Sequence, residues 1–204
     1  FEADRLDAKD AQAAQKLRQR AARLYQRAQR HAITTLAYHT PGFDAALASP
    51  TASHWPRITA ERVEVAYWAA AAWGAQIALS TDQPQVVADL PLAMRLAQLA
   101  YQVAPQHGQG ALASLMGSFE AVRPGGSAPM AARYFDEAIV LGRDKSAAVF
   151  VAKAEALALP AGDRATFEAL LRQALATSAA HPDLSNNVMR ERALWLLDTA
   201  DDLF

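Results

Sequence analysis

The feature that most constrains the fold is one helical spacing that recurs at nearly constant intervals along the chain. In each copy an apolar residue is followed by a second one four residues later and by an alanine three residues after that. Three copies begin 38 and 36 residues apart: Ala93–Ala97–Ala100, Ala131–Phe135–Ala138 and Phe167–Leu171–Ala174. Any amphipathic helix produces these steps, so a single copy would mean little. Three copies at regular separation predict stacked helical hairpins.

Tetratricopeptide repeats combine this spacing with a unit of about 34 residues. Pro105 follows Ala100 by five residues, as it often does in such repeats, and the N-terminal segment offers a further match at Ala21–Tyr25–Ala28. The signature of the first helix of each repeat is poor, and Arg143 stands where the next copy would carry its proline. We therefore predict an all-α fold, a tetratricopeptide-like helical-hairpin solenoid with degenerate repeats. It should form a single domain over residues 1–204.

Helix breakers divide the chain into segments of helical length, and no segment shows the alternation of a strand. The long loop 49–59 contains Pro50 and Pro56 among mostly small polar residues, and Thr59 is a suitable N-cap for the helix that follows. The expected helices cover residues 4–38, 43–47, 59–79, 90–103, 111–122, 128–141, 146–159, 164–179 and 185–203.

The expected helix that ends near Leu79 is apolar on nearly every side, which predicts a central helix buried on all sides. Its apolar stretch from Val65 to Leu79 is too short to span a bilayer. Tyr67 and Trp68 are neighbours on the helix, whereas Trp73 lies about 140° around the axis from Trp68. These three aromatic residues either fill the core on different sides or line a cavity for an apolar ligand. They are our candidates for a ligand passage, together with Phe119 of the expected short helix 111–122.

The balance of charge argues against nucleic-acid binding, because 20 lysines and arginines face 21 acidic residues. The charge is nevertheless uneven. Residues 16–30 hold six basic side chains and no acid: Lys16, Arg18, Arg20, Arg23, Arg27 and Arg30. This run is either the solvated face of a long helix or a docking face for an acidic partner.

The sequence contains no pattern that carries catalysis, a metal ion or a cofactor. There is no cysteine, which excludes disulfides and thiolate chemistry, and no two of the five histidines have the spacing of a helical zinc site. Phosphate-binding and nucleophile-elbow motifs are also missing, and the glycine pairs read as turns. We therefore expect a binding protein that has no cofactor and is not an enzyme.

One segment, the run Tyr67–Leu79, combines a tyrosine, two tryptophans and four central alanines. Further distinctive segments are Pro41–Phe43, Val87–Pro91, Gly110 with the following short helix, Arg123–Gly126, Ala131–Ala138, Asp163–Phe167 and Asp201–Phe204. Together these segments resemble the T-component of tripartite ATP-independent periplasmic (TRAP) transporters, and the run Tyr67–Leu79 is the most specific of them. The resemblance covers roughly residues 20–204.

This resemblance implies a periplasmic, non-catalytic lipoprotein that associates with the solute-binding protein of the transporter. It also implies homo-oligomers, which we expect to be trimers. It also implies a role in scaffolding, or in passing a small apolar or anionic organic ligand to that binding protein. A lipid-bearing cysteine should precede the mature domain and provide its attachment to the membrane.

Two other interpretations remain open. A generic tetratricopeptide adaptor would bind a peptide tail through a concave face rich in Asn, Lys and Arg, but the relevant helices here carry mostly alanine. A hydrolase would need histidine and acidic side chains that converge in a deep pocket.

Overall fold

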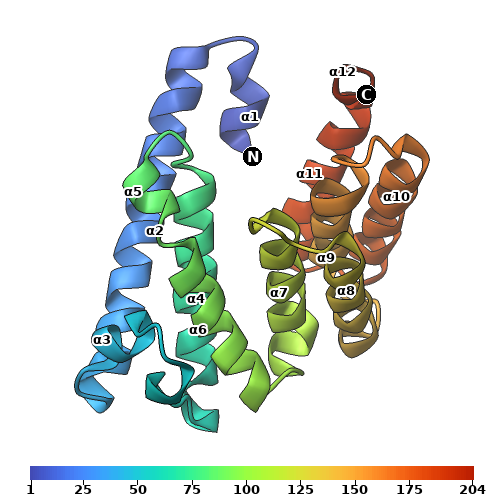
Figure 1. The fold of residues 1–204 in the computed structure, drawn as a ribbon. Helices are drawn as coiled ribbons and strands as arrows, with labels where there is room; N and C mark the ends of the chain where they lie inside the picture. The colour runs from blue at the N-terminus through green and yellow to red at the C-terminus, as the bar shows by residue number, and fades with distance from the viewer. The chain divides into compact units, whose positions relative to one another are not determined.

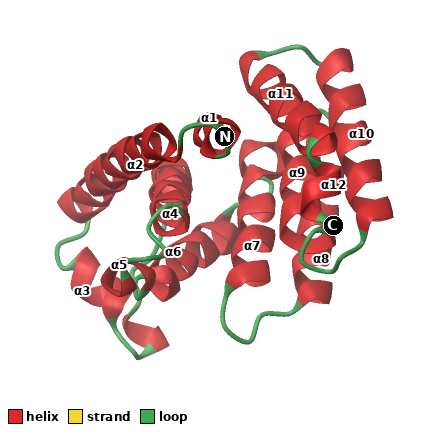
Figure 2. Ribbon diagram, turned by 90° about the horizontal axis from the view of Figure 1, so that it is seen from above, coloured by secondary structure: helices red, strands yellow, loops and turns green.

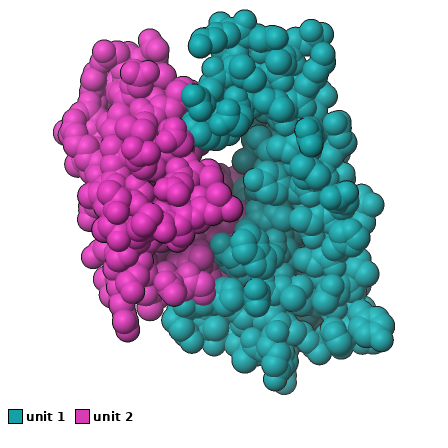
Figure 3. All heavy atoms as spheres, turned by 180° about the vertical axis from the view of Figure 1, so that it is seen from behind, with its two compact units in different colours: residues 1–107 teal, residues 108–204 magenta.

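The computed structural model describes residues 1–204 and consists of helices and turns without a strand (Figure 2). The predicted all-α fold is therefore confirmed. Contacts within the chain divide it into two compact units, residues 1–107 and residues 108–204, which Figure 3 shows in different colours. The single domain and the solenoid arrangement stay predictions.

The first unit is built around α4 (Val63–Ala78), which packs against α2 (Ala11–His39) and α6 (Leu90–Val103) (Figure 1). The shorter helices of this unit are α1 (Glu2–Asp7), α3 (Phe43–Ala48) and α5 (Pro84–Val87), with 3₁₀ turns at Ala52–His54 and Ala60–Arg62. Proline at the first turns of α5 and α6 suits a helix start, because its missing N–H would have no partner there.

The prediction of one continuous N-terminal helix over residues 4–38 is wrong in one respect. The segment is broken between α1 and α2. Asp10 caps α2: its carboxylate accepts a hydrogen bond of 2.9 Å from the backbone N–H of Ala13. Arg18 then reaches back and donates to Asp4 at 3.0 Å and to Asp7 at 3.1 Å. The cap and these ion pairs favour a turn that folds α1 against α2 over a continuous helix.

Helix α4 is less enclosed than its sequence suggested. Its buried residues include Val63, Trp73 and Ile77, but Trp68 keeps 58% of its surface exposed and Glu64, one turn earlier, is also exposed. The two long neighbours, α2 and α6, cover only part of the circumference of α4, so one side of α4 remains exposed to solvent. The expectation that this helix is buried on all sides is therefore wrong on the side of Trp68.

The second unit begins with α7 (Ala111–Val122) and α8 (Ala128–Gly142), which pack against each other. Helix α9 (Ala147–Lys153) continues as a π-helical turn at Ala154–Ala158 and packs on α10 (Arg164–Ala180). Helices α11 (Leu184–Asp198) and α12 (Ala200–Leu203) complete the unit. The expected helix 185–203 is therefore interrupted at Thr199, whereas α7, α8 and α10 begin where the sequence predicted.

The residues with the recurring spacing lie in the core. All nine members of the three copies have no more than 2% of their surface exposed: Ala93, Ala97, Ala100, Ala131, Phe135, Ala138, Phe167, Leu171 and Ala174. The fourth, N-terminal match is different, because Tyr25 is 42% exposed and Ala28 is exposed too. That match therefore does not mark a buried face of α2.

Buried polar side chains fix the turns of the second unit. The Asn186 side chain accepts a hydrogen bond from the N–H of Ala147 at 2.9 Å and donates to the carbonyls of Lys145 and His181 at 2.9 and 2.7 Å. It thereby satisfies the first N–H of α9, where no local side chain acts as a cap. One amide thus joins the turns before α9 and before α11.

A second polar cluster closes the turn between α7 and α8. The Glu120 carboxylate accepts two hydrogen bonds from Arg123, at 2.6 and 2.7 Å, and one of 2.9 Å from the N–H of Ser127. The guanidinium of Arg123, above all, lowers the pKa of Glu120, and the Ser127 N–H adds to the effect against an opposing contribution from burial. Gly126 is required in this turn, because a Cβ there would lie 2.1 Å from the Glu120 carbonyl oxygen.

Candidate functional site

The predicted aromatic residues are only partly brought together by the structure. The rings of Tyr67 and Trp68 meet edge to face with their centroids 5.0 Å apart, and Tyr67 also contacts the His107 ring at 5.4 Å. Tyr67 is half-buried, and burial raises the pKa of its hydroxyl above the ordinary value. Trp68 therefore presents an exposed indole that packs against Tyr67, and Tyr67 in turn contacts His107.

Trp73 and Phe119 are placed differently from this pair. Trp73 is only 8% exposed and belongs to the core of the first unit, so the suggestion that the tryptophans fill the core holds for Trp73 and not for Trp68. Phe119 is 4% exposed and lies on α7 of the second unit. As residues of a ligand passage, Tyr67, Trp68, Trp73 and Phe119 all remain predictions.

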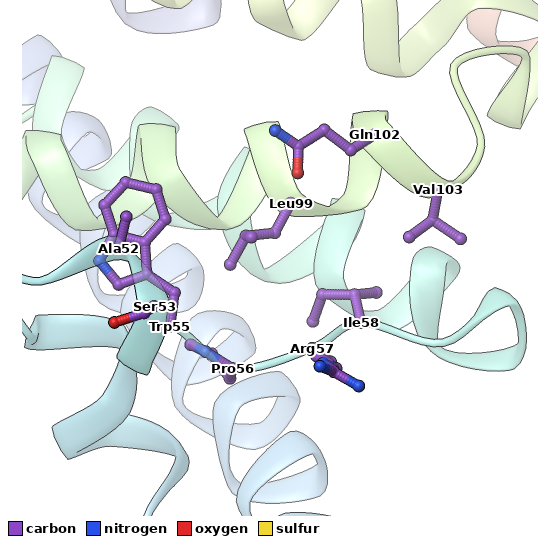
Figure 4. A pocket seen from close by; sticks show the side chains of 9 residues that line it. All are labelled: Ala52, Ser53, Trp55, Pro56, Arg57, Ile58, Leu99, Gln102 and Val103. Carbon is purple, nitrogen blue, oxygen red and sulfur yellow. The ribbon is translucent and has the colours of Figure 1, made fainter.

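A surface hollow of about 550 Å³ lies in the first unit, between the loop that precedes α4 and the C-terminal half of α6 (Figure 4). Leu99 and Val103 of α6 face Ile58 of the loop across it. The complete lining is Ala52, Ser53, Trp55, Pro56, Arg57, Ile58, Leu99, Gln102 and Val103. It is mainly apolar, with one hydroxyl, one cationic side chain and one amide, which is the usual composition of a site for small organic molecules.

Arg95 holds the loop side of this hollow in place. Its guanidinium lies 4.2 Å from the centre of the Trp55 ring and donates hydrogen bonds to the carbonyls of Leu47 and, at 2.9 Å, Ser49. The Trp55 indole N–H donates to the same Ser49 carbonyl at 2.9 Å. One side chain of α6 therefore anchors both the end of α3 and Trp55 in the wall of the hollow.

The sequence did not reveal this hollow, because mostly small polar residues in the segment 49–59 predict a solvated loop. The available signal was the pair of large apolar residues in it, Trp55 and Ile58, since a purely solvated loop has little use for either. Ile58 and Pro56 are in fact buried, while Arg57 between them is exposed. The alternation turns the two apolar residues inward and leaves the cation at the surface.

No group of three or more histidine and acidic side chains is arranged to hold a metal ion. None of the helices has both the length and the apolar character that crossing a bilayer requires.

Comparison with known proteins supplies the remaining evidence. The sequence model of the TRAP transporter T-component family matches residues 1–204. A search of curated proteins finds no match to the chain. The match spans the aromatic segment of α4, the turn at Arg123–Gly126 and the C-terminal helices on which the resemblance rested. The chain therefore belongs to the TRAP transporter T-component family and is a component associated with the periplasmic side of such a transporter.

Proposed function

We propose that the protein is a non-catalytic component that binds the solute-binding protein of its TRAP transporter. In this role it scaffolds that protein or passes to it a small organic ligand, apolar or anionic. The observation that carries the proposal is the family match, which runs over residues 1–204. The anchoring of the protein by a lipid and its assembly into trimers belong to the same proposal.

The exposed indole of Trp68 supports a role in docking. Large aromatic side chains are enriched at the centres of protein interfaces, where they exclude water and contribute strongly to binding. Trp68 stands on a helix whose other large aromatic residues are at least half-buried, so its exposure is not explained by the needs of the fold. Its edge-to-face contact with Tyr67 restrains the ring, which lowers the entropy that docking would cost.

The hollow beside α6 supports the handling of a ligand. Ile58, Leu99 and Val103 offer apolar surface to the body of a small molecule, and Arg57 at the rim offers a partner for a carboxylate. Arg57 makes no ion pair within the chain, so its charge is available to such a ligand. This composition fits an organic acid with an apolar chain.

The docking experiment mixes the purified protein with the solute-binding protein of its TRAP transporter, at micromolar concentration, and measures the mass of the complex by light scattering after gel filtration. We expect co-elution, and Trp68→Ala should weaken the complex. Tyr38→Ala is the matched control, because Tyr38 is an exposed aromatic residue of the same unit, on α2, with 83% of its surface exposed against 58% for Trp68. Absence of a complex at micromolar concentration would contradict the proposal.

The same instrument measures the protein alone, for which a mass of three 22.0 kDa chains is the expected result. Ligand binding is measured separately by the change of tryptophan fluorescence on titration with octanoate, an apolar acid. Trp55 in the wall of the hollow is the expected reporter. Arg57→Gln should weaken octanoate binding, whereas Arg133→Gln, an exposed arginine of the other unit, should leave it unchanged.

A further inference from the structure

Helix α2 presents one straight line of positive charge to solvent. Five basic residues follow each other at steps of four, three, four and three residues, and all five are exposed. We call them the cationic stripe: Lys16, Arg20, Arg23, Arg27 and Arg30. With 100° and 1.5 Å per residue, they fall within an arc of about 80° and extend over about 21 Å of the helix.

None of the five takes part in an ion pair within the chain. The remaining cation of this segment, Arg18, projects from the opposite side of the helix, and it alone is neutralised, by Asp4 and Asp7 of α1. Helix α2 itself contains no acidic residue between Ala11 and His39. The fold thus provides carboxylates for the inward-facing arginine and none for the stripe.

The stripe lies opposite the side of α2 that packs against the unit. The two buried residues of α2, Ala14 and Leu36, project about 160° away from the middle of the stripe. In the middle of the helix, residues 23–28 are all exposed, including Leu24 at 48%. No other part of residues 1–107 therefore covers the stripe.

This arrangement works against the stability of the isolated helix. Like charges three and four residues apart on a helix repel each other, and the stripe contains four such neighbouring pairs. Four of its five members are arginines, whose planar guanidinium groups suit paired hydrogen bonds to carboxylates. A row of unpaired arginines is therefore better explained by a partner than by the fold.

We propose that the cationic stripe docks a helix of a partner protein that carries Asp or Glu at the same alternation of three and four residues. That alternation averages 3.5 residues, the period at which two helices lying side by side keep the same faces in contact. Each acidic residue of the partner then meets one cation of the stripe along the whole length. The proposal concerns the chemistry of this surface and does not depend on the proposed function.

Two other occupants fit the observations less well. A second copy of the chain offers no matching helix: α10 carries a single acid, Glu168, and α11 carries only Glu191 and Asp198. A membrane surface would require an apolar face beside the charges, as in interfacial helices. The main apolar side of α2 packs against α4 and is not available for insertion.

The test measures the binding of a fluorescently labelled helical peptide by anisotropy at about 0.15 M salt, where exposed charges more than about 8 Å apart are screened. The probe peptide carries five glutamates at steps of four, three, four and three. The reference peptide has the same composition with the glutamates distributed around the helix. We expect the probe to bind at least about fivefold more tightly than the reference, as two well-placed ion pairs would give.

The variant Arg23→Gln/Arg27→Gln should weaken binding of the probe roughly tenfold, because it removes the centre of the stripe. The control Arg133→Gln/Arg143→Gln removes the same charge from exposed positions of the second unit and should leave binding unchanged. Far-UV circular dichroism verifies that both variants stay folded.

Three results would overturn the proposal. Equal binding of the probe and the reference would make the stripe a general surface for polyanions. Binding to phosphatidylserine vesicles that the double variant loses, without selective binding of the probe, would assign the stripe to a membrane. Failure of every probe to bind would leave the charges as solvated side chains.

Discussion

The two units of the molecule use their charged side chains in different ways. In residues 108–204, six of the nine lysines and arginines form ion pairs within the unit. In residues 1–107, only two of the eleven, Arg5 and Arg18, do so. The paired cations of the second unit are Arg123, Lys153, Arg164, Arg172, Arg190 and Arg192.

This difference concerns the availability of charge more than stability, because exposed ion pairs contribute little to folding. In the second unit, uncharged and acidic side chains also form hydrogen bonds within the unit. Asn186 accepts one from the N–H of Ala147, and Glu120 accepts one from the N–H of Ser127. The first unit leaves the cationic stripe, Arg57 and the Trp68 ring facing solvent. We infer that the second unit is organised mainly to hold its helices together, whereas the first retains groups for other molecules.

The first prediction, with the largest expected effect, tests this inference by comparing how much each tryptophan of α4 contributes to the free energy of unfolding. Trp73→Ala should lower the free energy of unfolding by about 3–5 kcal/mol, since it removes a buried aromatic side chain. Trp68→Ala should cost less than about 1 kcal/mol, because that ring is mostly in solvent. Urea denaturation followed by circular dichroism measures both. If the Trp68 variant loses as much as the Trp73 variant, Trp68 belongs to the fold and is not available for docking.

The contrast also shows what could be predicted from the sequence. The spacing of Ala131, Phe135 and Ala138 predicted a buried face correctly, because periodicity reports which side of a helix must avoid water. Composition alone could not locate the open side of α4, since a tryptophan that faces solvent looks the same in a sequence as a buried one. The number of neighbours around α4 decides that question, and it is a property of the assembled unit.

Trp55 and Ile58 signalled an apolar loop, but for a related reason the sequence could not show that this loop forms a hollow beside α6. It depends on Arg95 reaching the carbonyls of Leu47 and Ser49, 48 and 46 residues earlier in the chain. No local pattern encodes such a contact. Likewise, the break at Asp10 depends on Arg18 finding Asp4 and Asp7 once α1 has folded back. Local signals located most helices, whereas these long-range polar contacts decided the details of the site.

The second prediction concerns the polar interior of the second unit. Asn186→Ala should lower the free energy of unfolding by about 2–3 kcal/mol, because it leaves the Ala147 N–H without a partner in a buried environment. The neighbouring Asn187 is exposed, so Asn187→Ala serves as the control and should change little. Thermal unfolding monitored by circular dichroism compares the two variants. Equal stabilities would show that the Asn186 contacts are not needed to hold the turns before α9 and α11.

The third prediction uses the pH dependence of Glu120. Its pKa is lowered in the folded state by Arg123, so its contribution is present above the pKa of the unfolded chain and is lost as the pH falls through the folded value. Glu120→Gln should therefore cost about 1 kcal/mol at neutral pH, and the difference from the parent protein should shrink in acid. Glu64→Gln, at an exposed glutamate of α4 without an ion pair, should show no such trend. Urea midpoints across the acidic range provide the measurement, and a constant difference would contradict the role of the Glu120 charge.

The smallest effect is also the one that compares the two units most directly, because the same substitution should have opposite signs in them. Arg23→Gln relieves repulsion from Arg20 and Arg27 and should raise the free energy of unfolding by a few tenths of a kcal/mol, about 0.2–0.5 per like-charged pair. Arg172→Gln removes a contact of 2.6 Å to Glu168 on α10 and should lower it. Both changes should fade as salt is added, since they arise between exposed charges. A loss of stability in the Arg23 variant at low salt would mean that this arginine already has a partner within the chain. The larger number of unpaired cations in the first unit would then no longer indicate a partner outside the chain.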